Sequence, residues 1–133
     1  MSKTHLAEEL VKAAEGVMLP SERDSSFTVM KWPKATLPKD AAAFRKLIHL
    51  DAKTEVESFD ASAMLERLGK NTSTDGADVK TMRAKFRKLS AFLDEHFDEL
   101  VGFKVGKIKV ETYIVGASSD GEVIGLKASS VET

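Results

Sequence analysis

The chain has 133 residues, of which 42% are hydrophobic and 31% are charged, and its formal net charge is -1. This length and composition predict one globular domain over residues 1–133, large enough to fold without a disulfide or a structural metal. The absence of cysteine excludes disulfide frameworks and thiol nucleophiles, and it favours a reducing, cytoplasmic location. The balanced charge argues against direct nucleic-acid binding, and the sequence has no run of ~20 apolar residues that predicts a membrane span.

Helical spacing of apolar residues predicts four helices, over residues 4–15, 41–50, 61–68 and 78–100. Asp40 and Asp60 precede the second and third helices and are good N-caps. Gly16 follows the first helix and Gly69 the third, where a glycine supplies a left-handed conformation at low steric cost.

Strand patterns alternate with these helices. Residues 27–32, which end at Pro33, predict one strand, and residues 54–58 predict another. From residue 101 onward the apolar residues alternate, with a Ser-Ser-Asp-Gly turn between two runs, which predicts a C-terminal antiparallel hairpin and a third strand near Phe103. The fold class is therefore α+β, with a few helices packed over a small sheet.

The sequence carries no recognisable catalytic motif. His5, His49 and His96 lack metal-ligand spacing, and exposed helix positions explain them better. His49 and Asp51 could form a base and its orienting acid, but no nucleophile motif accompanies them. Phosphate-binding, dinucleotide-binding and metalloprotease patterns are also missing, so we expect neither an enzyme nor a bound cofactor.

Two groups of acidic residues admit both a structural and a functional interpretation. Glu22 and Asp24 lie in a loop that no apolar periodicity explains, although solvation alone accounts for many loop acids. Glu132 and Thr133 close the chain, either as a frayed end or as a cluster of hard oxygen donors. Carboxylate and hydroxyl oxygens are the ligands that a partly hydrated Mg²⁺ accepts.

The order of the segments resembles the nuclease A inhibitor family. An opening amphipathic helix is followed by VMLPSERDSSFTVMKW, by a long helix with AKFRKL and by the closing hairpin TYIVGASSDGEVIGLKASSVET. The resemblance covers nearly the whole chain. It implies a three-layer α/β/α sandwich with a mixed sheet, similar to that of plant pathogenesis-related proteins. It also implies inhibition of a sugar-non-specific nuclease of the ββα-metal type.

The same resemblance implies roles for individual residues in a one-to-one complex with such a nuclease. Thr133 would reach the catalytic Mg²⁺ of the partner, and Glu22 would engage its arginines. The nearest match to a third, mid-chain acid of the family is Asp75, although Gly76 follows it where the family has Trp. We therefore expect a nuclease-binding surface made of Glu22, Asp24, Asp75, Glu132 and Thr133, on a protein that is monomeric when free.

A second interpretation stays open. The resemblance implies a more acidic protein than this near-neutral chain, and the Trp after the mid-chain acid is replaced by Gly76. Both departures fit an intracellular binding or adaptor module that keeps the same fold and has a partner other than a nuclease.

Overall fold

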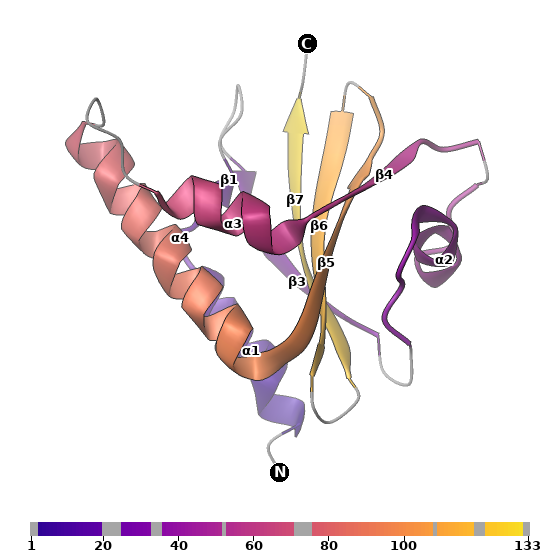
Figure 1. The fold of residues 1–133 in the computed structure, drawn as a ribbon, viewed down its shortest axis with the longest axis horizontal. Helices are drawn as coiled ribbons and strands as arrows, with labels where there is room; N and C mark the ends of the chain where they lie inside the picture. Colours follow the sequence, from indigo (N-terminus) through magenta and orange to yellow (C-terminus); the bar gives the residue numbers. More distant parts are fainter. Residues whose placement is uncertain are drawn as a thin grey trace.

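The computed structural model describes residues 3–19, 25–32, 36–51, 53–70, 76–107, 109–118 and 122–131. Within these residues the helices are α1 (Lys3–Ala14), α2 (Ala41–Leu47), α3 (Ala61–Gly69) and α4 (Ala77–His96) (Figure 1). The strands are β1 (Met18–Leu19), β2 (Ser25–Ser26), β3 (Thr28–Trp32), β4 (Val56–Phe59), β5 (Phe97–Val105), β6 (Lys109–Ser118) and β7 (Val123–Val131). The predicted α+β class is confirmed.

Five strands form one sheet in the order β3-β7-β6-β5-β4, and β1 pairs separately with β2. All four pairs of the larger sheet are antiparallel, so the expected mixed sheet is wrong. The physical reason lies partly in the connections: β5, β6 and β7 follow one another closely, whereas parallel neighbours need a crossover of about a dozen residues or more.

The predicted C-terminal hairpin and the third strand near Phe103 are both confirmed. Strands β6 and β7 pair from Ala117 opposite Val123 to Lys109 opposite Val131. Strand β5 pairs with the other edge of β6 and places Phe103 opposite Tyr113.

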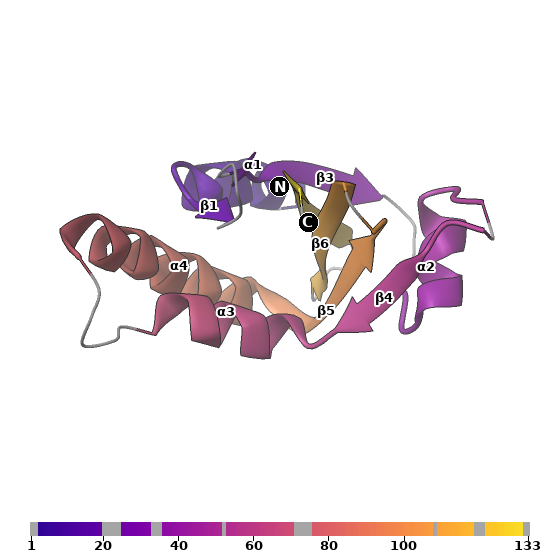
Figure 2. The ribbon, with the colours of Figure 1, turned by 90° about the horizontal axis from the view of Figure 1, so that it is seen from above.

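Alternating side chains give the sheet two apolar faces, and helices cover both. On β6, Ile114 belongs to a core with α1, α3 and α4, whereas Tyr113 and Val115 belong to a second core with α2. Figure 2 shows α2 on the opposite side of the sheet from the other three helices. Helix α2 contributes one buried side chain, Phe44, which stacks on Phe103 with ring centroids 4.3 Å apart.

The long helix is shorter than its apolar spacing predicts. We expected it to reach residue 100, but it ends at His96 and strand β5 begins at Phe97. Phe97 is 5% exposed and pairs with Ser118, with a register irregularity before Glu99. Because an apolar residue every three or four positions also fits a bulged strand, pairing with β6 outweighs the helical pattern.

The helix boundaries agree with the predicted caps in three of four places. The Asp40 carboxylate accepts a hydrogen bond from the Ala43 amide at 2.8 Å, and Asp60 accepts one from Ala63 at 3.0 Å. Gly16 has φ 79° and ends α1 as predicted. The second helix ends earlier than expected, at Leu47, because His49 adopts φ 59°.

The prediction for Gly69 is wrong, because this residue is the last of α3 and has no left-handed backbone. Its missing side chain makes room for α4 instead: a Cβ at Gly69 would lie 2.8 Å from Arg87 Cγ. Arg87 Nη1 donates to the Gly69 carbonyl at 2.6 Å, and Arg83 Nη1 donates to the Leu68 carbonyl at 3.1 Å. Two cations of α4 therefore satisfy carbonyls that a helix end leaves without partners, and they fix α3 against α4.

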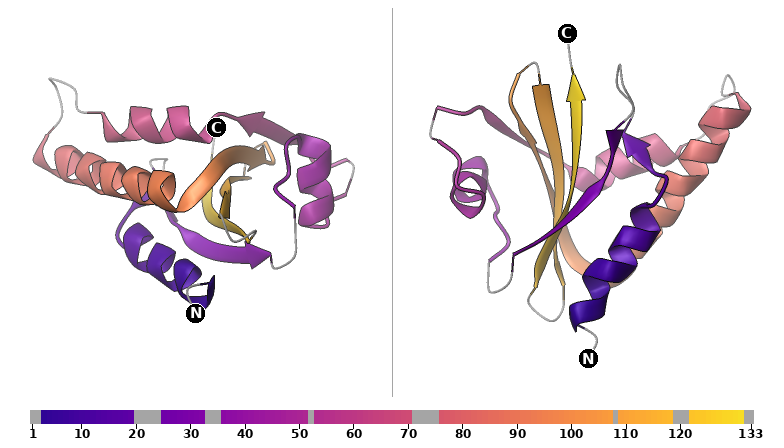
Figure 3. Two further views of the ribbon diagram at one scale, coloured as in Figure 1. Left: turned by 60° about the horizontal axis from the view of Figure 1, so that its bottom comes forward. Right: turned by 180° about the vertical axis from the view of Figure 1, so that it is seen from behind.

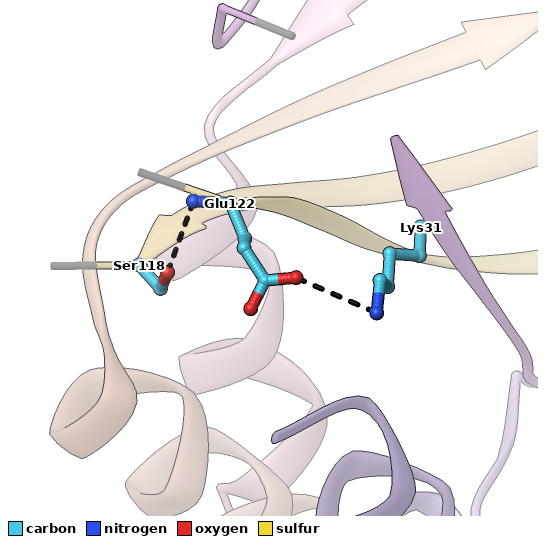
Figure 4. Close-up of polar contacts among 3 residues, drawn as sticks. All are labelled: Lys31, Ser118 and Glu122. Carbon is cyan, nitrogen blue, oxygen red and sulfur yellow. Dashed lines mark hydrogen bonds and ion pairs between the residues drawn. The ribbon is translucent and has the colours of Figure 1, made fainter. Parts of the chain in front are cut away.

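The turn end of the β6–β7 hairpin is fixed by a small polar network (Figure 4). The Ser118 amide donates to the Glu122 carbonyl at 2.9 Å, and the Glu122 amide donates to Ser118 Oγ at 3.2 Å. The Glu122 carboxylate lies 3.5 Å from Lys31 Nζ on β3. These contacts connect Ser118 on β6, Glu122 before β7 and Lys31 on β3, at the end of the sheet opposite the last residues of β7.

Candidate functional site

The residues that the sequence assigns to the nuclease-binding surface lie outside the described residues. These are Glu22, Asp24, Asp75, Glu132 and Thr133. The structure does describe the elements from which each of them departs. The geometry of the site is therefore built from those flanking positions.

The flanks of Glu22 and of Thr133 lie at the same end of the molecule. Leu19 pairs with Ser25 across the β1–β2 ladder, so the segment with Glu22 and Asp24 joins two adjacent positions. Both short strands contact β7, whose last described residue is Val131. Figures 1 and 3 show, from opposite directions, that the β1–β2 pair lies near the C-terminal end of β7. The segments that carry Glu22 and Thr133 are thus attached to neighbouring strands of the fold.

The flank of Asp75 is further away. Gly76 precedes α4 and provides no side-chain cap for it. The start of α4 points toward the same end of the molecule as Val131, but Figure 2 shows it well to the side of the sheet. The described residues that flank Glu22 and Thr133 therefore lie close together. The start of α4, which flanks Asp75, lies away from both.

The β-ladder continues almost to the final residues of the sequence. Val131 is paired with Lys109, and Ser129 with Glu111. The adjacent β5–β6 connection is itself anchored, because the Gly106 amide donates to the Glu55 carbonyl at 3.0 Å and Lys107 Nζ lies 3.1 Å from Glu55. The backbone is thus ordered by hydrogen bonds up to two positions before Thr133.

A polar cluster on the same part of the sheet was missed by the sequence analysis. Lys127 Nζ lies 2.7 Å from Glu111 Oε2 and 5.9 Å from the centre of the Tyr113 ring. Burial raises the pKa of the Tyr113 phenol, and the Glu111 carboxylate raises it further. The hydrogen bond to Glu111 raises the pKa of Lys127, so the ammonium stays charged.

The cluster borders an open groove of about 390 Å³ between β3 and β7, which we call the polar groove. Its lining residues are Ser26, Thr28, Met30, Lys127 and Ser129. The sequence does carry a signal for the polar cluster, although not for the groove, because residues equidistant from Asp120 become partners in the hairpin. That rule pairs Glu111 with Ser129 and Tyr113 with Lys127, and so predicts a polar patch on one face.

A comparison of the chain with models of protein families agrees with the family that the order of its segments predicts. The family model described as nuclease A inhibitor-like protein matches residues 4–133 of the chain. The chain belongs to the nuclease A inhibitor-like family. Among curated proteins, no sequence is detectably similar to it. The predicted family is therefore confirmed over nearly the whole length.

For this member of the nuclease A inhibitor-like family, His96 and the apolar stripe of α4 have structural explanations. Within the described ranges, no group of three or more His, Cys, Asp or Glu residues could hold a metal ion. His96 packs its ring on Phe92 with centroids 4.3 Å apart, whereas the side chain of His5 lies outside the described part. The apolar stripe of α4 faces the core, because Phe86 is buried and Met82 packs against the same cluster. None of the described helices is long and apolar enough to cross a bilayer.

Proposed function

We propose that this protein is a non-enzymatic inhibitor that forms a one-to-one complex with a Mg²⁺-dependent, sugar-non-specific nuclease of the ββα-metal type. Membership of the nuclease A inhibitor-like family over residues 4–133 is the observation that carries the proposal. The short distance between the β1–β2 pair, which flanks Glu22, and the end of β7, which flanks Thr133, supports the proposal. One compact site on a partner can contact both segments.

The mechanism is mimicry of the anionic backbone of a nucleic acid. A nuclease of this class binds the scissile phosphate through Mg²⁺ and arginine side chains. In the proposed complex, Thr133 would bind the metal of the nuclease and Glu22 would pair with its arginines, while Asp24 and Glu132 belong to the same contact surface. The substrate then loses the cation that would stabilise its transition state.

The sheet lowers the entropic cost of this binding. Because β7 is paired with β6 up to Val131, the backbone is already ordered to within two positions of Thr133. Each residue that is already ordered saves about 1–2 kcal/mol of backbone entropy at the moment of association.

Two finer assignments belong to the same proposal. We infer that the sheet with helices on both faces corresponds to the three-layer α/β/α sandwich of the plant pathogenesis-related proteins. We also place Asp75 at the edge of the nuclease contact rather than at its centre, because the adjacent start of α4 lies to the side of the sheet.

The direct test is a titration of a ββα-metal nuclease with the purified chain in Mg²⁺, with DNA and RNA substrates measured separately. We expect activity on both substrates to fall to zero at one equivalent of inhibitor. As a matched control, the chain should leave a nuclease without the ββα-metal fold fully active. Undiminished activity at a large molar excess would contradict the proposal.

An adaptor module with another partner is the second candidate. The near-neutral net charge favours it, because weak long-range attraction to a basic nuclease lowers the rate of encounter. In that case Glu22→Ala should leave binding to the true partner unchanged, and the titration above should show no inhibition.

A further inference from the structure

The charged residues of α4 differ between the two halves of the helix. From Ala77 to Leu89 the helix has five cations and a single acid, Asp78. The cations of this half are Lys80, Arg83, Lys85, Arg87 and Lys88. Near its C-terminal end the helix has Asp94 and Glu95 instead. The net charge of the whole chain therefore hides a strongly basic segment, and it does not exclude a local site for an anion.

The basic half of α4 is exposed and extends away from the sheet (Figure 2). Lys80, Arg87 and Lys88 all have exposed side chains. Because an α-helix turns by about 100° per residue, these three side chains leave the helix within about 100° of one another. Lys70, which follows α3, lines an open groove between α3 and α4 together with Arg87. We call Lys70, Lys80, Arg87 and Lys88 the basic surface.

The lysines of the basic surface have no acidic partner within the described ranges. Four other lysines each lie within 3.5 Å of a carboxylate oxygen, and all four belong to the sheet or to the connections of its strands: Lys31, Lys39, Lys107 and Lys127. Between described residues, Lys70, Lys80 and Lys88 form no such ion pair. The charges of these three lysines are therefore available to a binding partner.

The stability of α4 does not account for Lys80 and Lys88. Arg83 and Arg87 are explained by the carbonyls at the end of α3 to which they donate. Lys80 lies near the N-terminus of α4, where the helix macrodipole disfavours a cation. Neither lysine has an acid three or four residues away along the helix, so pairs within the helix do not support them. Binding of an anion would give both lysines a function.

The composition of the basic surface favours a nucleic acid over an acidic protein. The centre of a protein–protein interface is rich in aromatic residues and poor in lysine, whereas interfaces with nucleic acid are more polar and more positive. Three of the four residues of the basic surface are lysines, and the exposed apolar residue next to Lys80 is an aliphatic one, Val79. The groove between α3 and α4 also has Glu66 and Asp94 in its lining, so the outer surface of the helix suits an anion better than the groove does.

The spacing of the lysines fits an anion that repeats. Lys80 and Lys88 are eight positions apart, which is about 12 Å along the helix axis. Double-stranded DNA carries one negative charge per about 1.7 Å of its axis, so several phosphates lie within this span. One phosphate backbone can therefore contact both lysines at once, whereas a single small anion contacts one of them.

We propose that the basic surface binds the phosphate backbone of a nucleic acid duplex without reading its sequence. The lysines contact phosphate oxygens, which carry no sequence information directly. This inference goes beyond the proposed inhibition and does not depend on it, because it uses α3 and α4 and not the segments that carry Glu22 and Thr133. An inhibitor with this second activity would stay close to the substrate of its partner nuclease.

The test is the fluorescence anisotropy of a labelled DNA duplex of about 20 base pairs, titrated with the full chain at about 50 mM and about 200 mM salt. We expect a dissociation constant of about 10⁻⁵ M at the lower salt, similar for two unrelated sequences and clearly weaker at the higher salt. The variant with Lys70→Gln, Lys80→Gln and Lys88→Gln should bind at least about tenfold more weakly. Its dependence on salt should also be shallower, by about 0.9 in the logarithmic slope for each lysine removed.

The control variant has Lys46→Gln, Lys53→Gln and Lys109→Gln, which remove three exposed lysines from α2, from its connection to β4 and from β6. It has the same net charge as the first variant and should bind the duplex within about twofold of the natural chain. Circular dichroism shows whether both variants stay folded. Equal weakening by the two variants, or no salt-dependent binding by the natural chain, overturns the inference. Binding of poly-L-glutamate but not of the duplex would assign the surface to an acidic protein and would also overturn it.

Discussion

Phe44→Ala is expected to lower the free energy of unfolding by about 3–5 kcal/mol, the usual cost of removing a buried phenylalanine. Phe44 is fully buried and is the buried side chain of α2. Its ring stacks on Phe103 and meets the edge of Tyr113 at 4.9 Å, so the substitution leaves a cavity between the helix and the sheet. Urea denaturation followed by circular dichroism measures the change.

A matched control for this stability prediction is Phe92→Ala on the other side of the sheet. Phe92 is only partly buried, so the same chemical change should cost clearly less. Equal losses from the two substitutions would mean that α2 is not anchored through Phe44. A loss below about 1 kcal/mol at Phe44 would mean the same.

Glu22→Ala is expected to weaken inhibition of the partner nuclease by about thirtyfold or more, since a desolvated pair with an arginine is worth about 2 kcal/mol or more. Much of that loss is the cost of leaving the arginine buried without a partner. The measurement is an inhibition constant at a fixed ionic strength, because surface charge effects vary with salt.

Glu9→Ala is the control for that substitution. It also removes one negative charge, from an exposed position on α1, and should change inhibition less than about twofold. A similar loss of inhibition from both variants would show that Glu22 acts only through net charge. Unchanged inhibition by both would show that Glu22 is not part of the contact.

Local signals in the sequence were enough to predict most elements of this fold. Asp40 and Asp60 marked helix starts because a side-chain cap acts within three residues, and the alternation of β6 and β7 marked the hairpin. The change from helix to strand at Phe97 was not predictable in this way. It depends on pairing with Ser118, a contact between residues far apart in the sequence.

Gly69 shows the same limit for side-chain packing. A glycine near a helix end normally indicates a left-handed cap, but here it makes room for Arg87, which lies 18 residues later. The polar groove likewise depends on two strands, β3 and β7, that the sequence alone does not place side by side. The family, by contrast, could be predicted because its segments keep their order along the chain.

The most direct measurement of the central claim is the affinity of the nuclease for the chain with Mg²⁺ and after its removal by a chelator. If Thr133 binds the metal of the partner, removal of Mg²⁺ should weaken binding by at least about tenfold, since one good metal contact is worth more than 1.4 kcal/mol. Deletion of Thr133, or addition of one Gly after it, should abolish this dependence on Mg²⁺. Equal affinity with and without Mg²⁺, or the same dependence after the deletion, would contradict the account.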